Sequence, residues 1–275
     1  MSKIEIRNVT KVFGRHEAKG LALAREGVDK AEILARTGCT LGLKDVSLDI
    51  PEGEIFVIMG LSGSGKSTLV RHINRLIDPS AGAILFDGQD IMGYDARALR
   101  QFRRRSVSMV FQGFGLLPHR TVLQNAAFGL TARGEAPKAA HAKAMRWIET
   151  VGLSGYEAQY PSQLSGGMRQ RVGLARALAT DTDLILMDEA FSALDPLIRV
   201  DMQDLLLDLQ RSLKKTIVFI THDLDEAVRI GAQIAVMKDG RVIQVGTPAM
   251  ILDQPADEYV ARFVGRRTGQ GRALQ

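Results

Sequence analysis

The feature that most constrains this chain is a glycine-rich loop that lies between an apolar run and a helical pattern. The near-continuous apolar run at 54–59 is typical of a parallel strand covered on both faces. The loop after it has the pattern Gly-x4-Gly-Lys-Ser and consists of Gly60, Leu61, Ser62, Gly63, Ser64, Gly65, Lys66, Ser67 and Thr68. A strand, such a loop and a helix, in this order, predict a phosphate-binding loop in an α/β fold.

The residue types in the loop suit a nucleotide triphosphate. Glycines let successive backbone N–H groups point inward, and the N-terminus of the following helix adds positive potential. We expect Lys66 to bridge the β and γ phosphates and Ser67 to ligate Mg2+. The predicted ligands of the loop are therefore ATP and Mg2+.

A second apolar strand, at 184–187, ends in the carboxylates Asp188 and Glu189. The carboxyl ends of parallel strands meet at one edge of a sheet, so these acids should emerge beside the loop. We expect Asp188 to hold the Mg2+ shell, and Glu189 to orient or deprotonate the attacking water. Acids at a strand end are often simple caps, and it is the phosphate-binding loop that favours the catalytic interpretation.

A third segment, Ser165, Gly166 and Gly167, is predicted to open a helix. A serine N-cap followed by two glycines leaves backbone N–H groups accessible, and such a helix end can bind a phosphate. The same tripeptide is also an ordinary helix start, so by itself it leaves both interpretations open.

Composition sets wider limits. The 275 residues are 45% hydrophobic, enough for a sizeable core, and 36 Lys and Arg against 31 Asp and Glu leave a net charge of +5. This charge suits an anionic partner without choosing among nucleotide, nucleic acid and membrane. The single cysteine, Cys39, excludes an internal disulfide framework, and we expect it to pack rather than react. The N-terminus lacks a secretory signal and no apolar run is long enough to cross a bilayer.

Periodicity along the chain predicts strands alternating with helices. Ile4, Ile6 and Val9 have the spacing of an edge strand, and further strands are expected at 41–50, 83–86, 216–220 and 234–237. Between the first two, Asp29 with Glu32 forms a capping box, and Gly38 is a plausible helix stop. Helical patterns prevail at 113–174. This alternation predicts a mostly parallel sheet interrupted by a helical insertion.

The phosphate-binding loop, the acidic strand end and the Ser-Gly-Gly tripeptide together resemble the ATP-binding cassette family, over essentially the whole chain. The resemblance implies a P-loop NTPase core with a mostly parallel sheet, an antiparallel β subdomain and an inserted α-helical subdomain. It implies one ATP-binding domain at 1–275, with the helical subdomain at about 113–174, an N-terminal helical insertion at about 15–40 and a short tail at 265–275.

The resemblance also assigns roles to residues that the pattern alone does not identify. Phe13 matches the aromatic that stacks on adenine, although it could instead be a core aromatic. Gln112 matches the glutamine that contacts Mg2+ and water and senses the membrane subunits. His222 matches the histidine that reaches the γ phosphate. The loop expected to cross the dimer interface consists of Ser192, Ala193, Leu194 and Asp195.

The family mechanism implies two copies that meet head to tail, so that the chain acts as a homodimer. Each ATP would lie between the Lys66 loop of one copy and, in trans, the helix start at Ser165, Gly166 and Gly167 of the other. ATP would then favour the closed dimer, and hydrolysis would release it.

Within the family, several stretches resemble the subunits that drive import of glycine betaine, proline betaine and choline. They lie at 27–38, 54–68, 74–79, 109–130 and 221–231. Osmoregulated members continue into a tandem module like that of cystathionine β-synthase, whereas this sequence ends at Gln275. We therefore do not expect control by ionic strength or a cyclic dinucleotide through that module, and a nutrient uptake role, including choline, proline betaine or histidine, gains weight beside the osmoregulated one.

The implied partners are integral membrane permease subunits and a separate solute-binding protein, at the cytoplasmic face of the inner or plasma membrane. The segment 113–130 is the expected dock for a permease helix, unless its apolar residues form the core of the helical insertion. Two alternatives stay open: an importer for another amino acid or polyamine, and a soluble cassette protein acting on ribosomes or DNA. No basic linker with interleaved aromatics is present, so no nucleic-acid partner is expected.

Overall fold

The computed structural model describes residues 2–270, with side chains up to residue 265. The chain forms two compact units. The first comprises Met1–Asp95 and Ile220–Gln275, and the second comprises Ala96–Phe219. Whether they act as one ATP-binding domain stays a prediction.

The first unit contains an antiparallel four-stranded sheet with the order β2-β1-β4-β5. Its strands are β1 (Ser2–Phe13), β2 (Thr40–Pro51), β4 (Ala81–Phe86) and β5 (Gln89–Asp90). Ile4 pairs with Ile50 on one side and with Phe86 on the other. The prediction that Ile4, Ile6 and Val9 form an edge strand is therefore wrong. Side-chain alternation shows which face is buried, whereas backbone pairing with distant residues decides which strand lies at the edge.

Two helices lie between β1 and β2, as the predicted insertion requires: α1 (Glu17–Arg25) and α2 (Lys30–Thr37). The cap predicted for α2 is confirmed, because the Asp29 side chain accepts the backbone N–H of Glu32 at 2.8 Å. Gly38 ends α2 in the left-handed conformation, with φ of 67°. Helix α1 has no comparable signal, since His16 at its N-cap makes no side-chain capping bond.

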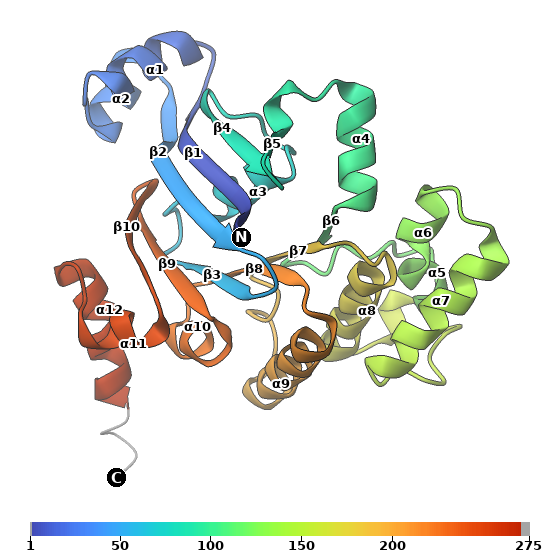
Figure 1. Cartoon of the computed structure of the whole chain (residues 1–275). Helices are drawn as coiled ribbons and strands as arrows, with labels where there is room; N and C mark the ends of the chain where they lie inside the picture. Colours follow the sequence, from blue (N-terminus) through green and yellow to red (C-terminus); the bar gives the residue numbers. More distant parts are fainter. Residues whose placement is uncertain (1, 271–275) are drawn as a thin grey trace. The chain divides into compact units, whose positions relative to one another are not determined.

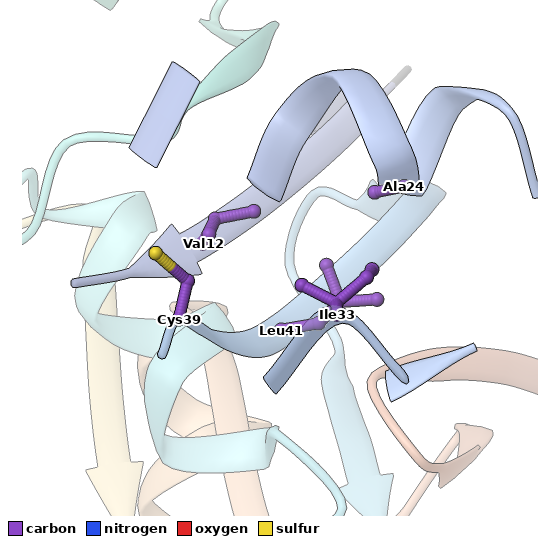
Figure 2. Packing of buried hydrophobic residues seen from close by; sticks show 5 residues of the cluster. All are labelled: Val12, Ala24, Ile33, Cys39 and Leu41. Carbon is purple, nitrogen blue, oxygen red and sulfur yellow. The ribbon is translucent and has the colours of Figure 1, made fainter. Parts of the chain in front are cut away.

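The insertion has a small hydrophobic core of its own, shown in Figure 2. It consists of Val12, Ala24, Ile33, Cys39 and Leu41. Leu21, Leu23 and Val28 pack around it. Cys39 is fully buried, which confirms that this thiol serves packing. The helices thus fasten to the sheet by apolar contact.

The remaining strands of the first unit surround the phosphate-binding loop. In β3 (Ile55–Met59) all five residues are buried, and β3 runs parallel to β9 (Gln233–Lys238). Strand β10 (Arg241–Gly246) pairs antiparallel with β9. Asp239 and Gly240 connect the two strands with φ of 49° and 78°, the geometry of a two-residue hairpin. The other helices of this unit that Figure 1 labels are α3 (Lys66–Ile73), α10 (Leu224–Ile230), α11 (Pro248–Asp253) and α12 (Glu258–Gln270). A short 3-10 helix, η1 (Ile91–Gly93), follows β5.

The second unit combines two parallel strands with a helical cluster. Strand β6 (Val107–Val110) runs parallel to β7 (Leu184–Asp188). Helices α5 (Val122–Ala126), α7 (Pro137–Thr150) and α8 (Gly166–Ala179) pack against one another, and α6 (Phe128–Ala132) packs against α8. The other elements are α4 (Ala96–Arg105), η2 (Pro161–Gln163) and α9 (Pro196–Leu213). Strand β8 (Thr216–Thr221) carries the chain from the second unit into the first.

No helix in the part of the chain that the structure describes combines the length and apolar character needed to cross a membrane.

The core of the insertion generates a stability prediction. Replacing Ile33 by alanine removes a fully buried side chain, so Ile33→Ala should lower the free energy of unfolding by about 2 to 5 kcal/mol. Leu34→Ala is the matched control on the same helix, because Leu34 is 50% exposed, and it should change stability by less than about 0.5 kcal/mol. Urea unfolding measures both, and equal losses would show that the cluster is not a core.

Candidate functional site

The phosphate-binding loop runs from the end of β3 to the start of α3 and needs glycine at two crowded positions. A Cβ atom on Gly60 would lie 2.3 Å from the carbonyl oxygen of Met237, and one on Gly65 would lie 2.9 Å from that of Gly42. Gly65 also has φ of 102° and is the N-cap of α3. Backbone contact and left-handed conformation together leave only glycine at Gly65.

The ammonium of Lys66 is held inside this loop. Its Nζ donates to the carbonyls of Gly60 at 2.8 Å and Leu61 at 3.0 Å, and the side chain is nearly buried. The Leu61 carbonyl also accepts the N–H of Ser64 at 3.1 Å. From β10's hairpin, Gly240 donates its N–H to the Ser64 carbonyl at 3.0 Å. The backbone of the loop thus surrounds the Lys66 ammonium without the help of a ligand.

These groups fit the triphosphate of ATP. The N-terminus of α3 supplies backbone N–H groups and partial positive charge, Lys66 supplies a full charge, and Ser67 supplies a hydroxyl in the first helical turn. The buried Ser64 hydroxyl has no hydrogen-bond partner among residues 2–270. A buried polar atom without a partner costs free energy, which an oxygen-rich anionic ligand can recover.

Phe13 lies at the end of β1 as a partly exposed aromatic, not a core one. Its side chain is 38% exposed, and Lys11 Nζ lies 5.3 Å from the ring centroid. The ring edge lies against Gly42, where an added Cβ would come within 2.6 Å of Phe13 Cε2. Because the Gly42 carbonyl also contacts Gly65, the aromatic and the phosphate-binding loop flank the same glycine. This placement suits a ring that stacks on the base of a nucleotide bound at the loop.

In the second unit, Gln112 and Glu189 lie together. Gln112 Nε2 donates to Glu189 Oε2 at 3.1 Å. Asp188 ends β7 and is buried, and Glu189 follows it in the left-handed conformation with φ of 46°. Non-glycine residues rarely adopt this conformation, and they concentrate at functional sites. The fold therefore buries the first of two adjacent carboxylates and pairs the second one with Gln112.

The loop after Glu189 is tied down at both ends. Ser192 donates from its hydroxyl to the Glu189 carbonyl at 2.9 Å. Arg199, on α9, donates from Nη2 to the carbonyls of Ser192 at 3.4 Å and Leu194 at 3.2 Å. Asp195 precedes α9 as its N-cap residue. Residues 192–195 thus form a held turn directly after the candidate catalytic carboxylate.

Ser165 is the N-cap of α8, as predicted, and its hydroxyl accepts the N–H of Met168 at 3.3 Å. A Cβ atom on Gly166 would meet nothing within 4 Å, whereas one on Gly167 would lie 2.7 Å from Ile198 Cγ2. The backbone at Gly166 is therefore open to approach. The helix is 14 residues long, and its open N-terminus can accept an anion from another molecule.

Two residues that sequence reasoning missed hold the segment after Gln112. Arg176, on α8, donates from Nη1 to the Gly115 carbonyl at 2.6 Å and from Nη2 to the Phe114 carbonyl at 3.1 Å. Burial lowers the pKa of Arg176 from its usual value, although the guanidinium stays charged. No sequence signal distinguishes Arg176 from the other basic residues of α8, because only the folded chain brings these carbonyls to it.

Asn125 fixes the other end of the same segment. Its Nδ2 donates to the carbonyls of Leu117, Arg120 and Thr121, and its Oδ1 accepts the N–H of Leu117. The sequence signal for this role is an asparagine between the apolar residues Val122 and Ala126, because an amide on a buried helix face needs hydrogen-bond partners. The structure shows Asn125 fully buried. Val122, Ala126 and Leu130 are buried. For these three residues of the segment 113–130, the structure therefore supports a place in the core of the helical insertion rather than on an exposed docking surface.

The predicted site residues fall in both units. Phe13, the loop at 60–68 and His222, which follows β8, belong to the first unit, whereas the others belong to the second. Among residues 2–270, no three His, Cys, Asp or Glu side chains form a cluster that could hold a metal ion by themselves. A metal ion bound by the described residues would therefore need hydroxyl, amide or ligand oxygens as well.

Comparison with known proteins identifies the family. The family model described as ABC transporter matches residues 43–192. The chain belongs to the ABC transporter family. It is 56% identical over 264 residues to the glycine betaine/carnitine transport ATP-binding protein of Listeria monocytogenes, which covers 96% of this chain and 66% of that protein. It is likewise 56% identical to the glycine betaine/proline betaine transport system ATP-binding protein of Escherichia coli, over 95% of this chain and 65% of that protein.

The chain thus spans a little under two thirds of these two relatives. The trimethylamine N-oxide transport system ATP-binding protein of Ruegeria pomeroyi is 52% identical, over 94% of this chain and 76% of that protein. The resemblance to the quaternary amine importers, stated from the motifs, is confirmed at this level.

Solved structures confirm the predicted fold class. An ATP-binding cassette in a dimeric post-hydrolysis state, bound to ADP and Pi, matches with a TM-score of 0.75 and 32% identity, covering 89% of this chain and 98% of that one. The cbiO1 protein of Clostridium perfringens, part of an ABC transporter complex, matches with a TM-score of 0.77 and 26% identity, covering 99% and 98%.

Proposed function

We propose that this chain is the ATP-hydrolysing subunit of an ABC importer that takes up a quaternary amine or a related solute. The observation that carries the proposal is the pairing of Gln112 with Glu189, directly after the buried Asp188. A carboxylate held by a glutamine at the end of a buried strand is the arrangement expected of a group that orients water for phosphoryl transfer.

In the proposed mechanism, each residue has one task. Lys66 neutralises charge on the β and γ phosphates, and the adjacent N–H groups of α3 hold their oxygens. Ser67, Gln112 and Asp188 are the proposed Mg2+ ligands, and the ion would supply charge neutralisation during the transfer. Glu189 orients the attacking water and accepts its proton, while His222 contacts the γ phosphate. Phe13 stacks on adenine.

The proposed working form is a head-to-tail homodimer. The open backbone at Gly166 and the Ser165 cap leave the N-terminus of α8 available to a nucleotide held by a second copy. Residues 192–195 would line the interface. The structural relative bound to ADP and Pi is described as a dimer, which supports this arrangement. ATP would then close the dimer by binding to both copies, and hydrolysis would reopen it.

The proposed solute follows from the relatives. Glycine betaine, carnitine, proline betaine and trimethylamine N-oxide appear in the names of proteins 52 to 56% identical to this chain, and each carries a nitrogen without an N–H group. Methionine import ATP-binding proteins are less similar, at 45 to 46% identity. The proposed partners are permease subunits and a separate solute-binding protein, with the chain peripheral at the cytoplasmic face of the membrane. No nucleic acid is proposed as a partner.

Glu189→Gln tests the hydrolytic role. The substitution keeps the size of the side chain but removes the proton acceptor, so ATP hydrolysis should fall by about a hundredfold to ten-thousandfold, with ATP binding retained. Steady-state phosphate release and equilibrium nucleotide binding measure the two effects. Glu149→Gln, at an exposed carboxylate on α7, is the matched control and should hydrolyse normally. Normal turnover in Glu189→Gln would remove this residue from the mechanism.

Ser165→Arg tests the shared site. A bulky side chain at the start of α8 should obstruct the nucleotide of the partner copy, and its positive charge is unfavourable at a helix N-terminus, so hydrolysis should fall by about a hundredfold while each copy still binds ATP. Ser154→Arg adds the same side chain at an exposed serine elsewhere in the second unit and should have little effect. Unchanged hydrolysis in Ser165→Arg would count against a nucleotide shared between copies.

Uptake by the assembled system tests the transport function and the solute class. With the permease and binding protein present, radiolabelled glycine betaine, proline betaine or choline should accumulate more than histidine or proline. Lys66→Ala should abolish this uptake, because the loop loses its phosphate-binding charge. Uptake of only an amino acid or polyamine would favour the importer alternative. Failure to co-purify with any permease would favour a soluble cassette protein.

A further inference from the structure

Helix α12 reaches the phosphate-binding loop through one tyrosine. The hydroxyl of Tyr259 accepts the backbone N–H of Leu61 at 3.3 Å and donates to the carbonyl of Met237 at 3.2 Å. Tyr259 lies in the first turn of α12, which begins at Glu258. One side chain near the end of the described chain therefore bonds both the loop and strand β9.

Both of these backbone groups matter for the shape of the loop. The Leu61 N–H belongs to the same planar peptide group as the Gly60 carbonyl, which accepts from Lys66 Nζ at 2.8 Å. The Leu61 carbonyl, in the next peptide group, accepts from Lys66 Nζ at 3.0 Å and from the N–H of Ser64 at 3.1 Å. The Met237 carbonyl is the atom against which Gly60 packs so closely that no Cβ fits. Tyr259 thus holds the loop at Leu61 and the strand surface on which the loop rests.

The Tyr259 side chain is itself held in place. Its ring packs edge-on against Phe263, with centroids 5.2 Å apart, and Lys238 Nζ lies 5.0 Å from its centroid. Burial raises the pKa of the Tyr259 phenol above its ordinary value. The hydroxyl therefore keeps its proton at neutral pH and can donate to Met237 while it accepts from Leu61.

The bond from Tyr259 takes up one N–H group of the loop, that of Leu61. Leu61 stands in the first half of the loop, before the positive-φ glycines Gly63 and Gly65. The N–H groups at the start of α3, after Gly65, take no part in this bond and stay available to phosphate oxygens. The tyrosine can therefore stay bonded while the nucleotide is bound.

We propose that Tyr259 is a positioning residue for ATP: its hydroxyl fixes the peptide group between Gly60 and Leu61, and with it the Gly60 carbonyl that holds the Lys66 ammonium. The affinity of the loop for nucleotide then depends on the position of helix α12, which carries Tyr259. This inference rests on the proposed function in taking ATP as the ligand of the loop. It adds a residue from outside the loop to the binding machinery.

Tyr259→Phe tests this role, because phenylalanine keeps the ring and its packing and removes only the hydroxyl. Loss of one hydrogen bond should raise the KM for ATP about fivefold, with a smaller change in kcat and little change in the thermal unfolding temperature. Tyr94→Phe is the matched control, since the Tyr94 hydroxyl donates to Gln89 Oε1 at 3.1 Å, and its KM should stay that of the wild type. An unchanged KM in Tyr259→Phe, or a fall in kcat and stability without a rise in KM, would overturn the proposal.

Hydrogen exchange in the nucleotide-free full chain provides a second measurement that does not depend on hydrolysis. The Leu61 amide should exchange faster in Tyr259→Phe than in the wild type, and at the wild-type rate in Tyr94→Phe. Equal exchange at Leu61 in all three proteins would overturn the proposed bond. A wild-type chain that protects Leu61 but neither binds nor hydrolyses ATP would overturn the proposed function and, with it, the role of Tyr259.

Discussion

The site depends on the burial of one charge. An ammonium that is nearly removed from water needs compensating acceptors, and Lys66 finds them in the carbonyls of Gly60 and Leu61. Those carbonyls can turn toward it only because the backbone passes through glycines at positions that admit no side chain. The loop then needs support from outside, which it receives at Ser64 from Gly240 and at Leu61 from Tyr259. A cation is in this way presented to a phosphate with its surroundings already arranged.

In the second unit, too, positively charged side chains donate to backbone carbonyls of loops, but the charged groups are guanidinium groups. Arg176 holds the segment after Gln112 by two carbonyls, and Arg199 holds the turn after Glu189 by two more. Each arginine lies on a helix whose N-terminus carries residues of the predicted nucleotide site. Helix α8 starts at the Ser165 cap, and α9 follows Asp195. A guanidinium donates several hydrogen bonds in a fixed plane, so an arginine on a helix can hold a neighbouring loop at a fixed position relative to that helix. Irregular segments with functional residues are thereby placed by regular ones.

Sequence reasoning succeeded where the signal is local. The α2 cap at Asp29, the helix stop at Gly38 and the Ser165 cap were all predicted, because each depends on residues within a few positions. It failed for the interior position of β1, which depends on pairing with residues about 80 positions away. It also missed Arg176, which lies 61 positions from its partner Gly115, and Tyr259, which lies 198 positions from its partner Leu61.

The sequence by itself determined the chemistry of this protein: a phosphate-binding loop, an acidic strand end, a serine-capped helix and the family to which they belong. These follow from short patterns whose residue types have specific chemical uses. Only the tertiary structure decided which groups hold those motifs in place. Glu189 is paired with Gln112, Phe13 and Gly65 flank Gly42, and Tyr259 bonds the loop at Leu61. The physical reason is that hydrogen bonds and close contacts depend on distance in space, which a one-dimensional pattern records only for neighbours in the chain.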